Sequence, residues 1–262
     1  MDQPDTLDRL PARLLGVWAH PDDEAYLSAG LMARMTDAGR SVTVITATRG
    51  EKGTDDERRF GTTAFATHRE RELRASLDTV GVRDLRFLGH GDGDCDTSNT
   101  SDFVSMIESV MREVRPSVIV TFGPDGITGH PDHQAVSRWT TEAWRRHGRG
   151  QLHYAAMTHD YVAEHADLHD RLGAFDEFGL DGPISVAADA VVAAYDLSDA
   201  ELDRKRQALA AHASQTVGLS AFMGEETYRT WWRTERFRRP TPTELATCPL
   251  PRPMGAAVEA AP

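Results

Sequence analysis

Cysteine is scarce in this chain, which has only Cys95 and Cys248 among its 262 residues. Two cysteines are too few for a disulfide framework or for a thiolate metal site. The sequence also lacks an apolar run of membrane-spanning length, and its N-terminal segment lacks the charged-then-apolar pattern of a secretory signal. We therefore expect a soluble, cytoplasmic, globular protein without a membrane partner.

Basic residues are outnumbered by acidic ones: 29 lysines and arginines stand against 41 aspartates and glutamates, which gives a formal net charge of -12. Nucleic acids and anionic membrane surfaces bind to basic faces, so we expect neither as a partner. Hydrophobic residues make up 40% of the chain, which is enough for a sizeable core. The length suits one large domain.

Apolar runs typical of strands alternate with segments of helical periodicity. Strands are predicted at 14–18, 41–48, 85–88, 117–122 and 152–157. Helices are predicted around 27–35, 68–80 and 103–114. Because strands and helices alternate, a parallel sheet with right-handed crossovers is the natural architecture. The predicted fold class is α/β, with a Rossmann-like, doubly wound, mostly parallel sheet.

The later part of the chain is less regular. A further apolar run spans 184–194, and a helix is predicted at 199–213. The last thirty or so residues are rich in proline, arginine and alanine. We therefore expect a single α/β domain over residues 1–232, followed by a C-terminal arm or tail at 233–262. Such an arm can pack on a neighbouring subunit, so a homo-oligomer stays open.

Two polar turns stand apart from the rest of the sequence. Residues 19–24 read Ala-His-Pro-Asp-Asp-Glu directly after the first predicted strand, and residues 129–133 read Gly-His-Pro-Asp-His after the fourth. In each, we expect the proline at the first helical position and the preceding histidine as the cap residue. With a strand order of 3-2-1-4, strands one and four are neighbours where doubly wound sheets bind their ligands. The two turns should face each other across that crevice.

This arrangement predicts a three-ligand metal site made of His20, Asp23 and His133. His20 and Asp23 are three residues apart in one tight turn, so both can point the same way. His133 falls in the first turn of a helix, where the positive helix end favours a neutral, ligating imidazole. Two histidines and one carboxylate with open positions suit catalytic Zn²⁺ carrying a water molecule, although the same set also suits non-haem Fe(II).

Two further side chains complete the predicted chemistry. Asp22 should project away from Asp23, which leaves it free to act as general base toward the metal-bound water. His130 lies three residues before His133 and can donate to a developing oxyanion. Other chemistries are disfavoured, because the sequence has no G-x-S-x-G elbow and no G-x-G-x-x-G after the first strand.

The segments at 19–24 and 130–133 resemble the paired motifs of the LmbE/PIG-L family of metal-dependent N-deacetylases. Weaker similarities are Thr48-Arg49-Gly50-Glu51, the Arg69-x-x-Glu72 spacing, and Lys205…His212-x-x-Gln215. The resemblance spans roughly residues 12–215. It implies a Rossmann-like fold and removal of an acyl group from an N-acylated amino sugar or a related conjugate.

Carried over by motif position, the resemblance implies roles for individual residues. The zinc ligands would be His20, Asp23 and His133. Asp22 would be the base that later returns its proton to the leaving amine, and His130 would steady the tetrahedral intermediate. Arg69 would resemble the family's arginine that contacts the sugar.

We expect the partner to be a small N-acylated sugar substrate that Arg69, Glu51 and Asp92 contact. Asp92 lies in the polar loop after the third strand, which we interpret as an active-site rim. That loop lacks the central glycine and closing glutamate of a calcium-binding EF-hand. Trp231 and Trp232 are expected to pack against the core rather than to line a substrate or partner surface.

Two alternatives to a sugar deacetylase stay open. One is an amidase that cleaves a thiol-sugar conjugate at the same zinc site. The other is a non-catalytic metal- or sugar-binding protein of the same fold, which the intact Asp22 disfavours.

Overall fold

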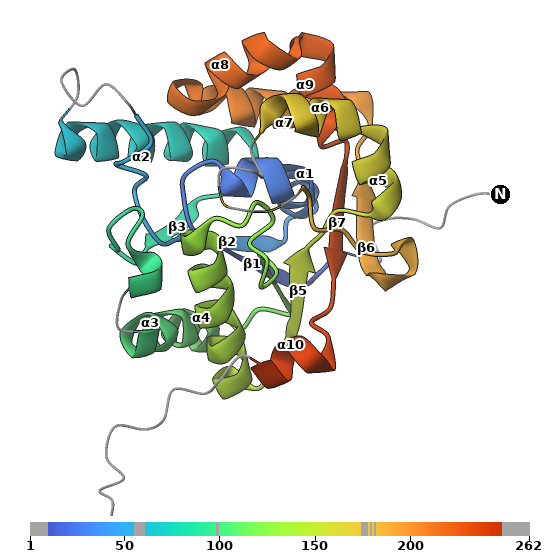
Figure 1. Ribbon diagram of the computed structural model, residues 1–262. Coiled ribbons are helices and arrows are strands. Elements are labelled where there is room, and N and C mark those ends of the chain that lie inside the picture. Colours follow the sequence, from blue (N-terminus) through green and yellow to red (C-terminus); the bar gives the residue numbers. More distant parts are fainter. Residues whose placement is uncertain are drawn as a thin grey trace, which may run out of the picture.

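A single seven-stranded sheet organises the computed structural model, which describes residues 10–54, 61–97, 100–173, 178, 180 and 182–247. The strand order is β3-β2-β1-β4-β5-β7-β6. The predicted order 3-2-1-4 is therefore confirmed, and β1 and β4 lie side by side at the point where the order reverses. Figure 1 shows the sheet between two layers of helices.

The first five strands are parallel, as the alternation of strands and helices predicts. They are β1 (Arg13–Trp18), β2 (Ser41–Thr46), β3 (Asp84–Phe87), β4 (Val118–Thr121) and β5 (Gln151–Ala155). Most of their side chains are buried, because helices cover both faces of the sheet.

Helices cross over between these strands. They are α1 (Asp23–Asp37), α2 (Thr62–Thr79), α3 (Thr100–Val114) and α4 (Pro131–His147), followed by the shorter α5 (His159–Glu164) and α6 (Ala166–Leu172). The helices α1 and α2 pack with α7 (Asp199–Ala211) on one face, whereas α3 and α4 pack together on the other. The α/β, doubly wound, mostly parallel fold is thus confirmed. None of the described helices combines the length and the hydrophobicity needed to cross a bilayer.

The segment expected to be a C-terminal arm contributes a strand to the sheet. Residues 234–238 form β7 (Thr234–Arg238), which lies antiparallel between β5 and β6 (Val191–Asp196). The sequence Thr-Glu-Arg-Phe-Arg does not look like a buried strand. Its buried Phe237 lies between two arginines, and its other inward residue is Glu235. The expected boundary at residue 232 must therefore move beyond β7, while residues 248–262 lie outside the described part.

Helices α8 (Ala213–Met223) and α9 (Glu225–Trp231) lie above the carboxyl ends of the parallel strands (Figure 1). The short α10 (Pro242–Thr247) follows β7 at the opposite end of the sheet. Single turns of 3-10 helix occur at Cys95–Thr97 and Ala188–Ala190 in the described part of the chain.

A buried ion pair joins α1, α7 and β7. Lys205 Nζ lies 2.7 Å from a carboxylate oxygen of Glu235 and also donates to the backbone carbonyl of Tyr26. The Glu235 carboxylate in turn accepts the backbone N–H groups of Gly30 and Leu31, each at 2.8 Å. Both charged side chains are almost fully buried. A buried charge is stable only beside an opposite charge and hydrogen-bonding groups, which Lys205 and Glu235 find in each other and in these backbone groups.

The substitution Lys205→Met tests this pair. It leaves the Glu235 charge buried without its cation, so we expect the free energy of unfolding in urea to fall by about 3–5 kcal/mol. The matched control Arg206→Met, on the same helix as Lys205, breaks an exposed pair with Glu225 at the start of α9 and should cost less than about 1 kcal/mol. Equal losses in the two variants would contradict the assignment, and Lys205→Met combined with Glu235→Gln should recover part of the loss.

An ion pair at the start of α7 gives a pH-dependent contribution to stability. Glu201 completes a capping box with Ser198, and it also pairs with the Arg34 guanidinium at 2.8 Å. The hydrogen bond from Arg34 is the main cause that lowers the pKa of Glu201 from 4.5 to about 2. Because the folded-state pKa is depressed, this stabilisation is present above pH 4.5 and is lost as the pH falls toward 2.

The variant Glu201→Gln should therefore be less stable than the wild type by about 1–2 kcal/mol at pH 7, allowing for the partial exposure of the pair. Urea unfolding at a series of pH values should show this difference shrinking below pH 4.5. The exposed Glu226 lies 3.7 Å from Arg229, and Glu226→Gln should differ by less than about 0.5 kcal/mol throughout. A Glu201→Gln difference that stays constant with pH would refute the assigned cause.

Candidate metal centre and active site

The two His-Pro-Asp turns meet at the carboxyl ends of β1 and β4. His20 follows β1 and His133 lies in the first turn of α4, yet His20 Nδ1 and His133 Nε2 are only 3.1 Å apart. Parallel pairing of β1 with β4 brings these segments together, although 113 residues separate them in sequence. The structure thus brings these side chains together at the switch point, where the sequence predicts a crevice.

The two turns begin their helices in different ways. At α4 the expectation is confirmed, because His130 is the N-cap residue, Pro131 is the first helical residue, and His130 Nδ1 accepts the Asp132 N–H. At α1 the same expectation is wrong, because the helix begins at Asp23 and Asp22 is its N-cap residue. Asp22 has φ of 114°, a left-handed backbone that is costly outside glycine and that directs its side chain away from that of Asp23.

Both histidines present a free ring nitrogen to the same point. His133 Nδ1 lies 2.9 Å from the Gly126 carbonyl and must donate to it, which leaves Nε2 with its lone pair. His20 Nε2 lies 3.2 Å from Asp132 and 3.1 Å from Asp92, so its Nδ1 is the nitrogen that faces His133. Carboxylate and carbonyl partners of this kind orient metal-binding histidines.

Asp23 supplies an oxygen beside these nitrogens. Its Oδ2 accepts the backbone N–H of His20 at 2.8 Å, which fixes the turn, and its Oδ1 lies 3.4 Å from His133 Nε2. In a tetrahedral site with bonds of about 2.0–2.1 Å, ligand atoms lie about 3.3 Å from one another. The separations of 3.1 Å between His20 and His133 and of 3.4 Å between His133 and Asp23 fit such an ion, whereas His20 Nδ1 lies 3.8 Å from the nearest Asp23 oxygen, Oδ2.

Two overlapping groups of the described side chains have ligand atoms close enough to share an ion, and Asp23 belongs to neither group. One joins His20 and His133 with His130, and the other joins His20 with Asp92 and Asp132. In the second group, Asp132 already accepts the Gly93 and Cys95 N–H groups at 2.7 and 3.0 Å. Asp132 and Asp92 are therefore better placed to hold His20 than to bind an ion themselves.

Burial keeps two of the three histidines neutral. It lowers the pKa of His133 to about 3 and that of His130 to about 4. Since His130 Nδ1 accepts a backbone N–H, its proton must be on Nε2, which leaves this residue as a hydrogen-bond donor. His20 differs: burial lowers its pKa, but the hydrogen bonds to Asp132 and Asp92 and the charges of Asp23 and Asp92 together outweigh burial and raise the pKa to about 10. A cation that binds His20 Nδ1 must therefore displace a proton from it.

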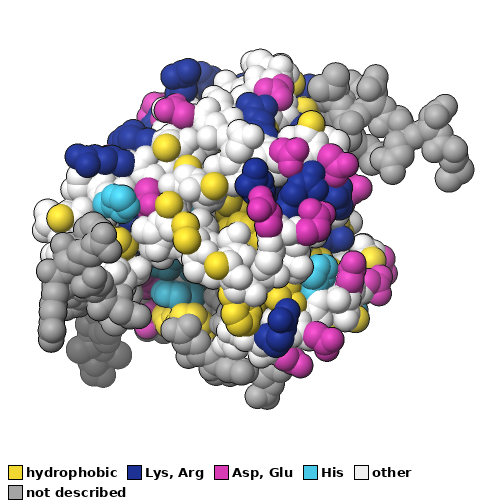
Figure 2. All heavy atoms as spheres, turned by 90° about the horizontal axis from the view of Figure 1, so that it is seen from above, with side chains coloured by type: hydrophobic (Ala, Val, Ile, Leu, Met, Phe, Trp, Pro, Cys, Tyr) yellow, Lys and Arg dark blue, Asp and Glu magenta, His cyan; other side chains and the backbone are white. Residues whose placement is uncertain are grey.

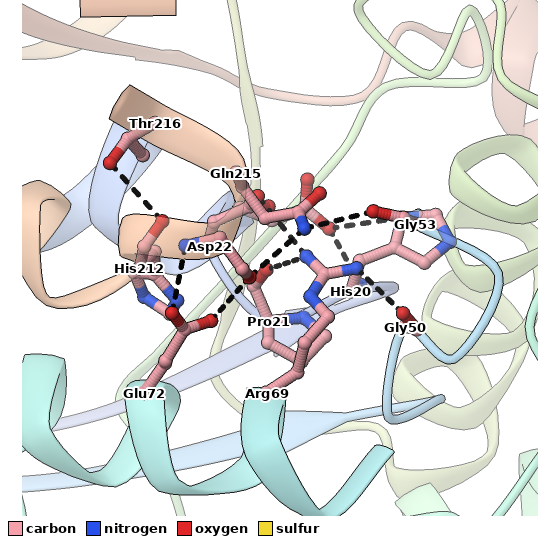
Figure 3. A network of polar contacts seen from close by, with 12 residues as sticks. His20, Pro21, Asp22, Gly50, Gly53, Arg69, Glu72, His212, Gln215 and Thr216 are labelled. Carbon is pink, nitrogen blue, oxygen red and sulfur yellow. Dashed lines mark hydrogen bonds and ion pairs between the residues drawn. The ribbon is translucent and has the colours of Figure 1, made fainter. Parts of the chain in front are cut away.

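Asp22 is held apart from the ligand set by Arg69. An Arg69 Nη2 atom lies 3.2 Å from Asp22 Oδ2 and also donates to the Pro21 carbonyl (Figure 3). Burial raises the pKa of Asp22 to about 6, although the Arg69 charge opposes this rise. A carboxylate with a pKa near neutrality can take up and release a proton during a reaction near neutral pH.

The three residues expected to contact substrate make mostly internal contacts. Arg69 is 3% exposed, and its guanidinium bonds Gly50 as well as Pro21 and Asp22. Asp92 is 6% exposed and bonds the Lys52 N–H, while Glu51 accepts the N–H of Asp92. These contacts order the loops after β2 and β3 around the site. Direct contact of Arg69, Glu51 or Asp92 with a substrate stays a prediction.

Comparisons with known proteins bear on this site. The PIG-L family model, described as GlcNAc-PI de-N-acetylase, matches residues 15–144. The chain is 32% identical to a 1D-myo-inositol 2-acetamido-2-deoxy-alpha-D-glucopyranoside deacetylase of Kineococcus radiotolerans, over 82% of this chain and 73% of that protein. The chain belongs to the PIG-L family.

Two other similarities agree with the PIG-L membership that the sequence motifs predict. The chain is 36% identical to a probable N-acetyl-alpha-D-glucosaminyl L-malate deacetylase 2 of Bacillus cereus, over 55% of this chain and 68% of that protein. The fold resembles that of N,N'-diacetylchitobiose deacetylase from Pyrococcus horikoshii, with a TM-score of 0.62, 20% identity, and coverage of 90% and 86% of the two chains.

Two structural features of this PIG-L protein were missed from the sequence. Asp132 is fully buried and holds His20 by a hydrogen bond. Its place inside the second motif could have indicated that it belongs to the site. Glu24 accepts the N–H of Asp22, and its other oxygen lies 2.9 Å from His212 Nε2, with both side chains fully buried. No local pattern could pair Glu24 with a residue 188 positions away.

Replacing Asp132 by asparagine tests its anchoring role. Asparagine keeps one acceptor oxygen and loses the charge, so we expect metal affinity, measured by competition with a chromophoric chelator, to fall about 10- to 100-fold. Asp96→Asn, at an exposed carboxylate of the nearby 3-10 turn, is the matched control and should leave affinity unchanged. An Asp132→Asn protein with wild-type affinity would show that His20 does not depend on this anchor.

Proposed function

We propose that this protein is a zinc-dependent amide hydrolase that removes an N-acetyl or other N-acyl group from an amino sugar or a sugar-containing small molecule. The observation that carries the proposal is the division of the two adjacent aspartates. Asp23 faces His133 within the set of candidate ligands, while Asp22 is bound by Arg69 outside that set. One site therefore offers both a three-ligand metal centre and a separate base.

The ligand chemistry supports zinc as the proposed metal. Two imidazole nitrogens and one carboxylate oxygen, with room for a further ligand, suit catalytic zinc. When bound there, zinc would act as a Lewis acid toward the amide carbonyl and would lower the pKa of a water molecule.

The chain's own residues would then manage the protons. Asp22 takes a proton from the attacking water, and the Arg69 guanidinium keeps its carboxylate in place. Asp22 later gives this proton to the departing amine. His130, neutral and with its proton on Nε2, donates a hydrogen bond to the carbonyl oxygen as negative charge develops there.

The substrate class is supported by the relatives. Both curated relatives described above carry names of deacetylases that act on N-acetylglucosamine-type conjugates. We therefore propose an N-acetylglucosamine conjugate as the substrate, with the amide on the sugar as the bond that is cleaved.

An amine-release assay with an N-acetylglucosaminyl inositol as substrate tests this function. Asp22→Asn removes the base, so we expect kcat to fall by about 10²–10⁴-fold, with zinc content by elemental analysis unchanged. A chelator should abolish wild-type activity and added zinc should restore it. Asp160→Asn, at an exposed carboxylate on α5, is the control and should behave as the wild type. Undiminished turnover by Asp22→Asn would eliminate Asp22 as the base.

A further inference from the structure

A cavity of about 300 Å³ adjoins the candidate metal centre. Asp22, Asp23 and His133 line one part of it. Its volume is about ten times the ~30 Å³ that a water molecule occupies in the liquid. The methyl group of an acetyl substituent would fill only a small part of this space, so the cavity can hold a larger group next to the bond that is cleaved.

The other walls of the cavity are aromatic and aliphatic. Leu219 from α8, Trp231 from the end of α9 and the adjoining Trp232 line it, together with Tyr26 and Leu27 from α1. Trp231 and Trp232 contact the hydrophobic core as expected, but they also line this cavity, which the expectation did not include. Figure 2 looks down on this side of the molecule and shows a hollow where histidine and acidic side chains lie beside hydrophobic ones.

The polar atoms of these aromatic walls are paired or buried, since Trp232 Nε1 is buried and has no hydrogen-bond partner among the described residues. The Tyr26 hydroxyl is 3.0 Å from the Tyr228 hydroxyl, and Trp231 Nε1 donates toward His169 on α6 at 3.4 Å. These rings therefore offer the cavity mainly their carbon surfaces. Helix α8, which carries Leu219, contains no charged residue.

Few polar groups remain for a ligand beyond the catalytic carboxylates and His133. Among the lining residues that the structure describes, the other polar side chains are Thr128 and Gln215, besides the tyrosine hydroxyl and the two tryptophan N–H groups. The Gln215 amide nitrogen already bonds the Gly53 carbonyl at 3.0 Å (Figure 3). A sugar ring that loses its water here would leave most of its hydroxyl groups without protein partners, at a cost of about 1–3 kcal/mol each. An apolar group requires no such partners.

We propose that this cavity binds an apolar substituent of the substrate, carried either on the acyl group or on the aglycone of the amino sugar. The proposal rests on the proposed function, since it takes the substrate to be an N-acylated amino sugar. Burial of each methylene in such a cavity favours the reaction of the longer substrate, by about fourfold in kcat/KM per carbon. The gain stops when the cavity is full.

Two series of substrates distinguish the source of the apolar group. The first consists of methyl glycosides of glucosamine N-acylated with two-, four- and six-carbon chains. The second consists of methyl, butyl and hexyl glycosides of N-acetylglucosamine. Amine release should rise with chain length in one series, which identifies the acyl chain or the aglycone as the occupant. Flat or falling kcat/KM in both series overturns the proposal.

Variants on one helix connect the effect to the cavity. Leu219→Ser introduces a hydroxyl into the wall, so we expect the gain per methylene to fall below about twofold. Val217→Ser, on the same helix but 64% exposed and outside the cavity lining, makes a similar change and should keep the wild-type dependence on chain length. The bulky Leu219→Trp should remove the preference for long chains by filling the space. Thermal unfolding of each variant checks that the fold is retained.

Binding measurements separate this proposal from the proposed function. Calorimetry with zinc-loaded Asp22→Asn protein gives the Kd of every compound in both series. If no compound is hydrolysed by the wild type while Kd falls with chain length, the proposed function fails and the apolar cavity stands. If acetyl compounds are hydrolysed while neither Kd nor kcat/KM depends on chain length, the proposed function stands and the apolar cavity is overturned.

Discussion

The buried carboxylate of Asp132 joins three separate segments of the chain at the candidate metal centre. It belongs to the first turn of α4, it accepts the N–H groups of Gly93 and Cys95 from the loop after β3, and it lies 3.2 Å from His20 after β1. A carboxylate removed from water is stable only when its oxygens are fully hydrogen-bonded. The same bonds fix the His20 ring so that Nδ1 faces His133 and Asp23.

Three consecutive carboxylates, Asp22, Asp23 and Glu24, are tolerated because each has different partners. Asp23 faces the histidines and accepts backbone N–H groups, Asp22 is bound by Arg69, and Glu24 pairs with His212. Glu24 also accepts the N–H of Asp22, whose left-handed backbone sends the two aspartate side chains in different directions. A strained residue at a functional site persists only where surrounding contacts fix it, as they do here.

The C-terminal third of the chain completes the fold and the cavity beside the site. β7 fills a place inside the sheet, and its Glu235 is neutralised by Lys205 from α7. Helices α8 and α9 then supply Leu219 and Trp231 to the cavity wall. The α/β core thus positions the polar groups that are proposed to act on the amide, while these later elements supply the apolar surface that is proposed to select among substrates.

The sequence by itself determined the parallel sheet, its order 3-2-1-4 and the meeting of the two His-Pro-Asp turns. These features follow from local periodicity and from the rule that parallel strands end at one edge of the sheet. Tertiary structure alone decided that β7 enters the sheet, that α1 starts at Asp23, that Arg69 binds Asp22, and that Glu24 pairs with His212. Charged residues such as Glu235 and Arg69 look solvent-exposed in a sequence, because only a partner far along the chain makes their burial favourable.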